Sequence, residues 1–313
     1  MGTSARSVFS FMPGASLPDL RGSPSEPVGS AQPHRGPGLI ATNTPQRGGV
    51  TASTRIREGL GMTVDHATPD PTHERAGAAS VDAHLTSVRT ASERAITASL
   101  QAHRPELGRV HQLDLDIAEW ARLVVTPSGS QLQAARKELG LAEYCVAAGL
   151  YRQAYASLRL FLELSFAAVH FSVNELERRL WMSDRIDFSW SAALQNTDGL
   201  LSRRFVGEFA PELIGAADDF ANQALKCYRH CSQFVHGKAA VTQDIPDRVE
   251  YAGPVVSDWC DTASQAAEAV LFLLYIRYGE EFDVNGTPAL QETIIEQFGS
   301  IPAVRGLLDH SGE

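Results

Sequence analysis

A short stretch near the middle of the chain combines one arginine with two histidines. Residues 228–237 read Tyr-Arg-His-Cys-Ser-Gln-Phe-Val-His-Gly, which brings Arg229, His230 and His236 within ten residues. In a helix, seven residues turn through about 700°, so Arg229 and His236 fall on the same face. A guanidinium is a permanent cation, and an imidazole titrates near neutral pH. This pairing suits chemistry on a phosphate group.

These residues lie at the end of a predicted helix that spans about 210–236. Pro211 suits the first turn, where a missing N–H costs nothing. An apolar stripe runs along the helix from Leu213 to Val235, and Gly237 is well placed to cap its C-terminus. The helix therefore holds the arginine and the second histidine in its last two turns.

Apolar residues recur elsewhere at helical spacings of three and four, and no convincing strand pattern appears. The expected helices cover about 79–105, 109–124, 131–147, 151–181, 191–207, 210–236, 255–278, 288–298 and 302–309. The apolar run from Val270 to Ile276 is too short to span a bilayer and indicates a core helix. The sequence predicts an all-α fold, an up-and-down helical bundle with flanking helices and a disordered N-terminal tail.

The domain organisation follows from composition. Residues 1–50 hold seven Pro and eight Gly, too many to bury a core, and we expect a disordered tail over 1–75. Met62 is an alternative start of translation. The remaining segments are an N-terminal helical extension over 79–130, the bundle over 131–280 and an acidic C-terminal helical extension over 281–313.

Charge and motifs exclude several classes of protein. The formal net charge is -10, and residues 241–313 carry 3 basic against 13 acidic residues, which argues against a broad nucleic-acid surface. Any RNA contact must be local. The chain has no P-loop and no dinucleotide, esterase or zincin motif. Four cysteines in 313 residues indicate reduced thiols in a cytoplasmic protein rather than a disulfide framework. The scarcity of lysine relative to arginine is typical of a GC-rich bacterial genome.

Plainer interpretations stand beside the chemical one. Cys227, His230 and Cys231 share helical spacing, but no second ligand pair accompanies them, so we expect buried thiols and neither metal nor cofactor. His236 could serve only the helix C-terminus, and Arg229 could pair with Glu163, Asp218 or Asp219. Arg159 and Glu163, four residues apart, could form a structural ion pair.

The stretch Arg229-His230-x5-His236 resembles the Rx4–6H signature of the HEPN superfamily (higher eukaryotes and prokaryotes nucleotide-binding domains). That family carries a polar residue after the arginine and allows four to six residues before the histidine. Upstream, Leu158-Arg159-Leu160-Phe161-Leu162-Glu163 resembles the Leu-Arg-x3-Glu stretch on the first core helix of related bacterial proteins. The resemblance covers about 131–280.

The resemblance implies a homodimeric, metal-independent endoribonuclease that cleaves RNA through its own 2′-OH. His236 would act as base or acid, Arg229 would hold the phosphate, and His230 would add a polar contact. Arg159 and Glu163 would lie near the cleft. A role as a toxin or phage-defence effector, with an antitoxin or defence-system partner protein, would follow by analogy. The alternative is a non-catalytic helical module that dimerises or binds RNA or a partner protein.

Overall fold

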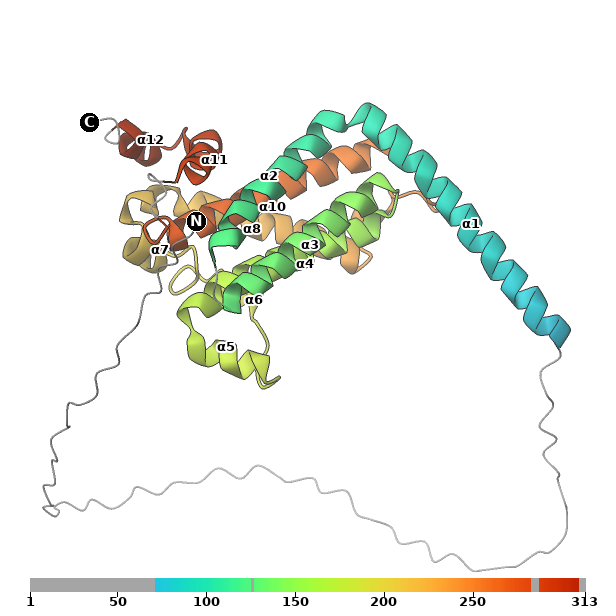
Figure 1. Cartoon of the computed structure of the whole chain (residues 1–313), viewed down its shortest axis with the longest axis horizontal. Coiled ribbons are helices and arrows are strands. Elements are labelled where there is room, and N and C mark those ends of the chain that lie inside the picture. Colours follow the sequence, from blue (N-terminus) through green and yellow to red (C-terminus); the bar gives the residue numbers. More distant parts are fainter. Residues whose placement is uncertain (1–70, 125–126, 283–286, 310–313) are drawn as a thin grey trace, which may run out of the picture. The chain divides into compact units, whose positions relative to one another are not determined.

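The computed structural model describes residues 71–124, 127–282 and 287–309, and within these ranges every regular element is a helix. The all-α prediction is therefore confirmed for this part of the chain. All of it belongs to the second of two compact units, His66–Glu313. Residues 1–70 of the tail expected over 1–75 lie outside the described residues. The last five residues of that range are instead the start of α1, which begins at Pro71 (Figure 1). The helices are α1 (Pro71–Ala102), α2 (Arg104–Leu123), α3 (Pro127–Ala147), α4 (Tyr151–Val173), α5 (Glu175–Met182), α6 (Trp190–Ala193), α7 (Arg203–Phe209), η1 (Pro211–Leu213), α8 (Ile214–Val235), α9 (Ala239–Thr242), α10 (Gly253–Tyr278), α11 (Pro288–Phe298) and α12 (Pro302–Asp309).

The core of the bundle forms around α10, which packs against α2, α4 and α8. Every residue from Val270 to Ile276 is buried, as expected for a helix that is apolar on all sides. Each large apolar side chain buried in this way contributes about 1.5–3 kcal/mol. Helix α2 shares this core, although it lies in the expected N-terminal extension. The boundary expected between that extension and the bundle, at residues 130 and 131, falls inside α3 (Pro127–Ala147).

Helix α4 carries Arg159 and Glu163, which the sequence analysis placed near the site. It packs against α3, α8 and α10. Among the described helices it alone has the length and apolarity to cross a membrane, but half of that stretch is buried inside the bundle. Packing on three neighbouring helices accounts for its apolar composition.

Two of the expected helix ends are wrong, and both involve proline. The first helix was expected to run to about residue 105, but α1 ends at Ala102 and Pro105 lies in the first turn of α2. Likewise, the helix expected to begin at about residue 131 already begins at Pro127, as α3. In both places proline opens a helix, where its missing N–H has no intrahelical acceptor to lose.

The single helix expected over 151–181 is interrupted at Asn174. The Asn174 side-chain amide donates to the His170 carbonyl at 3.1 Å, a local bond that competes with continuation of the helix. The helix expected over 191–207 is also wrong, since α6 and α7 are separate there. Ser189 and Ser202 cap them, accepting hydrogen bonds from backbone N–H groups three residues later. No helix was expected between residues 236 and 255, but α9 lies there.

The turn between α3 and α4 is held against the segment that leads into α10. Gly149 adopts φ 76°, a left-handed conformation that favours glycine. A Cβ at this position would lie 2.9 Å from the Glu250 carbonyl oxygen. Beside it, the Tyr151 hydroxyl donates to that same carbonyl at 3.0 Å and accepts from the Ala252 N–H at 2.6 Å. This contact fixes the start of α4 and the start of α10 together.

Replacing Gly149 with alanine should therefore destabilise the protein by about 1–3 kcal/mol, because alanine disfavours positive φ and its Cβ would meet backbone. Gly140 is the matched control, since it lies inside α3 and a Cβ there would meet nothing within 4 Å. Gly140→Ala should instead stabilise the helix by about 0.5–1 kcal/mol. Urea unfolding of both variants measures the difference, and equal midpoints would contradict this account of the turn.

Candidate functional site

The C-terminus of α8 has a well-defined cap, as the sequence predicted. Gly237 adopts φ 63°, its N–H donates to the Phe234 carbonyl at 3.1 Å, and the Lys238 N–H donates to the Gln233 carbonyl at 3.0 Å. This pair of bonds is a Schellman motif, which satisfies carbonyls that the helix end would otherwise leave free. The position of His236, the residue before Gly237, is therefore fixed by backbone hydrogen bonds.

Arg229 and His236 are both exposed to solvent. Because α8 runs without interruption to Val235 and His236 is its C-cap, the seven-residue spacing keeps both side chains on one side of the helix. Neither side chain makes a hydrogen bond or ion pair with any residue that the structure describes. In particular, Arg229 does not pair with Glu163, Asp218 or Asp219, the acidic partners considered as alternatives. A guanidinium and an imidazole therefore stand free at the end of α8.

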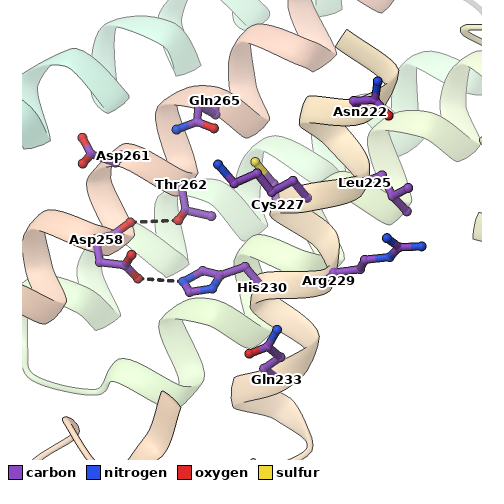
Figure 2. Close-up of a pocket in the computed structure, with 11 residues that line it drawn as sticks. Asn222, Leu225, Cys227, Arg229, His230, Gln233, Asp258, Asp261, Thr262 and Gln265 are labelled. Atoms are coloured by element: carbon purple, nitrogen blue, oxygen red, sulfur yellow. Dashed lines mark hydrogen bonds and ion pairs between the residues drawn. The ribbon is translucent and has the colours of Figure 1, made fainter. Parts of the chain in front are cut away.

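His230 faces a different neighbour. Its Nε2 lies 2.7 Å from Oδ2 of Asp258 on α10, and the Tyr155 hydroxyl on α4 donates to the same oxygen at 2.5 Å. The imidazole also makes edge contacts with the rings of Tyr155 and Phe234, which stack on each other at 3.6 Å between centroids. Figure 2 shows His230 pointing from α8 to Asp258, whereas Arg229 extends to the opposite side of α8. Three helices thus fix one imidazole.

The hydrogen bonds determine which groups carry protons. The bond from His230 is the main cause that holds the pKa of Asp258 below its usual value, and the bond from Tyr155 acts in the same direction. Burial, reinforced by Asp258, raises the pKa of Tyr155, so that the phenol keeps its proton. With an ionised carboxylate as acceptor, His230 donates through Nε2–H, and its Nδ1 has no hydrogen-bond partner among the described residues.

The lowered pKa of Asp258 predicts an acid-dependent contribution to stability. An ionised Asp258 stabilises the fold above its unfolded pKa of about 4, and the contribution disappears as pH falls through the lower folded pKa. The side chain is 51% exposed, so we expect no more than about 1 kcal/mol. Urea unfolding at several pH values should show Asp258→Asn less stable than wild type near pH ~7, with the difference shrinking below pH ~4.

Asp261, an exposed neighbour on the same helix, provides the control for that measurement. Its carboxylate makes no ion pair with the described residues, so Asp261→Asn should leave the pH dependence of unfolding unchanged. A gap between wild type and Asp258→Asn that stayed constant into the acid range would contradict the assigned role of the Asp258 charge.

Arg159 and Glu163 form the ion pair that their spacing suggested, at 3.1 Å, and both bind the Tyr228 hydroxyl. The guanidinium also lies 4.7 Å from the centre of the Tyr228 ring, whose other contact is a stacked Trp190. These residues join α4 to α8 at the position just before Arg229. They contact neither Arg229 nor His236 directly, so they can act on the site only by holding α8 in place.

An open cavity of about 580 Å³ lies between α8 and α10 (Figure 2). Its lining combines cationic, imidazole and carboxylate groups with amides and small side chains: Asn222, Leu225, Lys226, Cys227, Arg229, His230, Gln233, Asp258, Asp261, Thr262 and Gln265. His236 is not among the lining residues. The lining therefore includes Arg229 as well as the bonded pair of His230 and Asp258, although the Arg229 side chain extends away from that pair, and it does not include His236.

The cysteines near the site are structural. Cys227 and Cys231 are buried, and burial raises the pKa of Cys227 to about 12, so its thiol stays protonated. Burial also raises the pKa of the Cys231 thiol. No group of three or more His, Cys, Asp or Glu residues in the described ranges is arranged to hold a metal ion. The nearby His230 is instead bound to Asp258.

Sequence analysis did not identify Asp258 or Tyr155 as members of the site. Asp258 is 28 residues from His230 and 103 from Tyr155, and no local spacing signals contacts at those separations. Tyr155 belongs to the predicted apolar face of its helix, where its ring suits the core and nothing indicates a role for its hydroxyl. Only the packing of α4, α8 and α10 brings the three side chains together.

Comparison with protein-family models, with curated proteins and with solved structures found no match for this chain.

Proposed function

We propose that the protein is a metal-independent endoribonuclease of the HEPN type, with its site at the C-terminal end of α8. The observation that carries this proposal is the free, exposed pair formed by Arg229 and His236 on one side of a capped helix end. Unpaired cationic and titratable groups on a helix end whose backbone is well capped suit a ligand that brings its own negative charge. A phosphodiester with a neighbouring hydroxyl meets that requirement.

In the proposed reaction the His236 imidazole accepts the proton of a ribose 2′-OH. The 2′-oxygen attacks the adjacent phosphorus while the bond from phosphorus to the 5′-oxygen breaks. Arg229 stabilises the charge that develops on the phosphoryl oxygens. The departing 5′-oxygen takes a proton from a second imidazole, which gives a 2′,3′-cyclic phosphate and a 5′-hydroxyl. DNA lacks the attacking hydroxyl and should remain uncut.

Two further groups would support this chemistry. His230 is held by Asp258, with its Nδ1 available to contact the substrate, as described above. Lys226 lines the same cavity as Arg229, where it adds positive charge. A second copy of the chain would supply the second His236, which makes the active form a homodimer. A toxin or phage-defence role remains the biological setting that the HEPN resemblance suggests.

The proposal is tested by incubating the purified full chain with RNA, and separately with DNA of the same sequence, in excess EDTA. We expect RNA fragments that end in 2′,3′-cyclic phosphate and 5′-hydroxyl groups, and intact DNA. RNA that stays intact, or cleavage that requires a divalent metal, would contradict the proposal. Intact RNA that still binds, in a gel-shift assay, would favour the non-catalytic binding module instead.

A further inference from the structure

The first helix, α1, has a stripe of small and apolar residues that the bundle covers only in part. Its members alternate at spacings of four and three residues and share one face of the helix: Val81, Leu85, Val88, Ser92, Ala95 and Ser99. The last three are buried, and the Ser99 hydroxyl donates to the Ala147 carbonyl of α3 at 3.1 Å. The second half of the stripe therefore belongs to the contact between α1 and the bundle.

The first half of the stripe has no such cover. Val81 is 56% exposed, Leu85 is 58% exposed, and within residues 79–90 only Val88 is partly buried. A helical stretch of this length has marginal stability in water when nothing packs on it. The exposed half of α1 would therefore gain stability from a partner that covers its apolar stripe.

The charges beside the stripe fit a second copy of this chain. Asp82 and Arg89 each follow a member of the stripe, Val81 and Val88, and so flank the same edge of it. When two copies of α1 pair in opposite directions about a two-fold axis, Leu85 of each copy packs on Val88 of the other. This arrangement also places Asp82 of each copy beside Arg89 of the other, which gives two opposite-charge pairs along one edge of the contact.

A parallel pair lacks this complementarity. It would place Arg89 beside His84 of the other copy, where both groups can be cationic, and would leave Asp82 without a cation. In the single chain Asp82 makes no ion pair with the described residues, and Arg89 has only Glu93, at 3.7 Å, with side chains 71% and 65% exposed. Exposed pairs of this kind contribute little to stability, so Arg89 can exchange its partner at low cost.

A cavity beside the same part of α1 gives a second helix room. It has a volume of about 770 Å³ and lies between one side of α1, from His84 to Ala98, and residues 247–251. Two more of the residues on the α1 side, Ala91 and Ala95, are also alanines, and such small side chains let another helix approach closely. Because the paired helices run in opposite directions, the start of the second copy's α1 would lie along this cavity.

We propose that α1 is a self-association surface through which two copies of the chain pair as antiparallel helices, with Val81, Leu85 and Val88 at the centre of the contact. The surface includes neither Arg229 nor His236. The proposal therefore does not depend on the ribonuclease activity proposed for the end of α8.

The test is sedimentation equilibrium of the full chain over a series of concentrations, without RNA. We expect a reversible equilibrium between monomer and dimer. Leu85→Glu should raise the dissociation constant of the dimer by about 100-fold or more, because symmetry places two unpaired carboxylates in the apolar contact. The control is Leu176→Glu on α5, where the leucine is 71% exposed and lies outside the proposed surface, and it should leave the equilibrium unchanged.

Reversal of the charges tests the direction of pairing. Asp82→Arg and Arg89→Asp, each alone, should weaken the dimer by about tenfold, since each brings like charges together twice. The chain that carries both substitutions should regain the wild-type affinity to within about threefold, because opposite charges then face each other again. Circular dichroism verifies that every variant keeps its helix content.

A chain that stays monomeric at every concentration would overturn the proposal and assign the stripe to a different partner. A dimer that Leu85→Glu weakens no more than Leu176→Glu does would also overturn it, since α1 would then lie outside the contact. If the doubly reversed chain pairs no better than the single reversals, the antiparallel arrangement is wrong.

Discussion

The Arg229→Ala variant should cleave RNA about 100- to 1,000-fold more slowly than the wild-type chain, the loss expected when one group that stabilises developing phosphoryl charge is removed. The stability of the fold should hardly change, because Arg229 is exposed and binds none of the described residues. Initial rates of RNA cleavage in excess EDTA measure the effect, and urea unfolding verifies that the variant is folded.

Two further variants test whether the loss of activity is specific to the Arg229 guanidinium. Arg203 on α7 is also exposed, at 73% for its side chain, and lies 4.0 Å from Asp218. Arg203→Ala should cleave at the wild-type rate, since it removes an equal charge away from the site. Arg229→Lys should recover only part of the activity, because lysine keeps the charge but lacks the planar fork that binds phosphate in a bidentate manner. Full activity in Arg229→Ala would remove Arg229 from the mechanism.

The His236→Ala variant should lose about 100- to 10,000-fold in cleavage rate, the range expected when a group that transfers a proton in the transition state is removed. Gly237 and its Schellman bonds involve backbone only, so the helix end should persist without the imidazole. Single-turnover rates with RNA in excess EDTA measure the loss.

His111→Ala is the matched control for this variant, because His111 is 60% exposed and its nearest acidic partner, Glu143, lies 3.6 Å away. It should cleave RNA as the wild-type chain does. If His236→Ala kept full activity while His230→Ala lost it, proton transfer would belong to the imidazole held by Asp258, and the role assigned to His236 would be wrong.

The sequence predicted helices well where strong terminal residues coincide with an apolar stripe. The helices expected over 288–298 and 302–309 are α11 and α12, each of which opens with a proline. Prediction failed where a proline has two possible roles, as at Pro105, and where a single polar side chain interrupts an apolar pattern, as at Asn174. In both places local hydrogen bonding decides where the helix begins or ends, and the spacing of apolar residues carries no information about it.

For the candidate site, too, the sequence predicted some features and missed others. Local spacing was enough to predict the end of α8 at Gly237 and the pairing of Arg159 with Glu163. Local spacing could not predict that the pair would hold Tyr228, or that Asp258 would hold His230, because those contacts cross between helices. The exposure of the two proposed catalytic groups depends in turn on which face of α8 the rest of the bundle covers.

The most direct measurement uses a DNA oligonucleotide that contains a single ribonucleotide, incubated with the full chain in excess EDTA. The free pair at the end of α8 predicts one cut, directly after the ribose, with a 2′,3′-cyclic phosphate on the product, and no cut by the chain that carries both Arg229→Ala and His236→Ala. An uncut oligonucleotide, cleavage at deoxyribose positions, or equal cleavage by the double variant would contradict the proposed site.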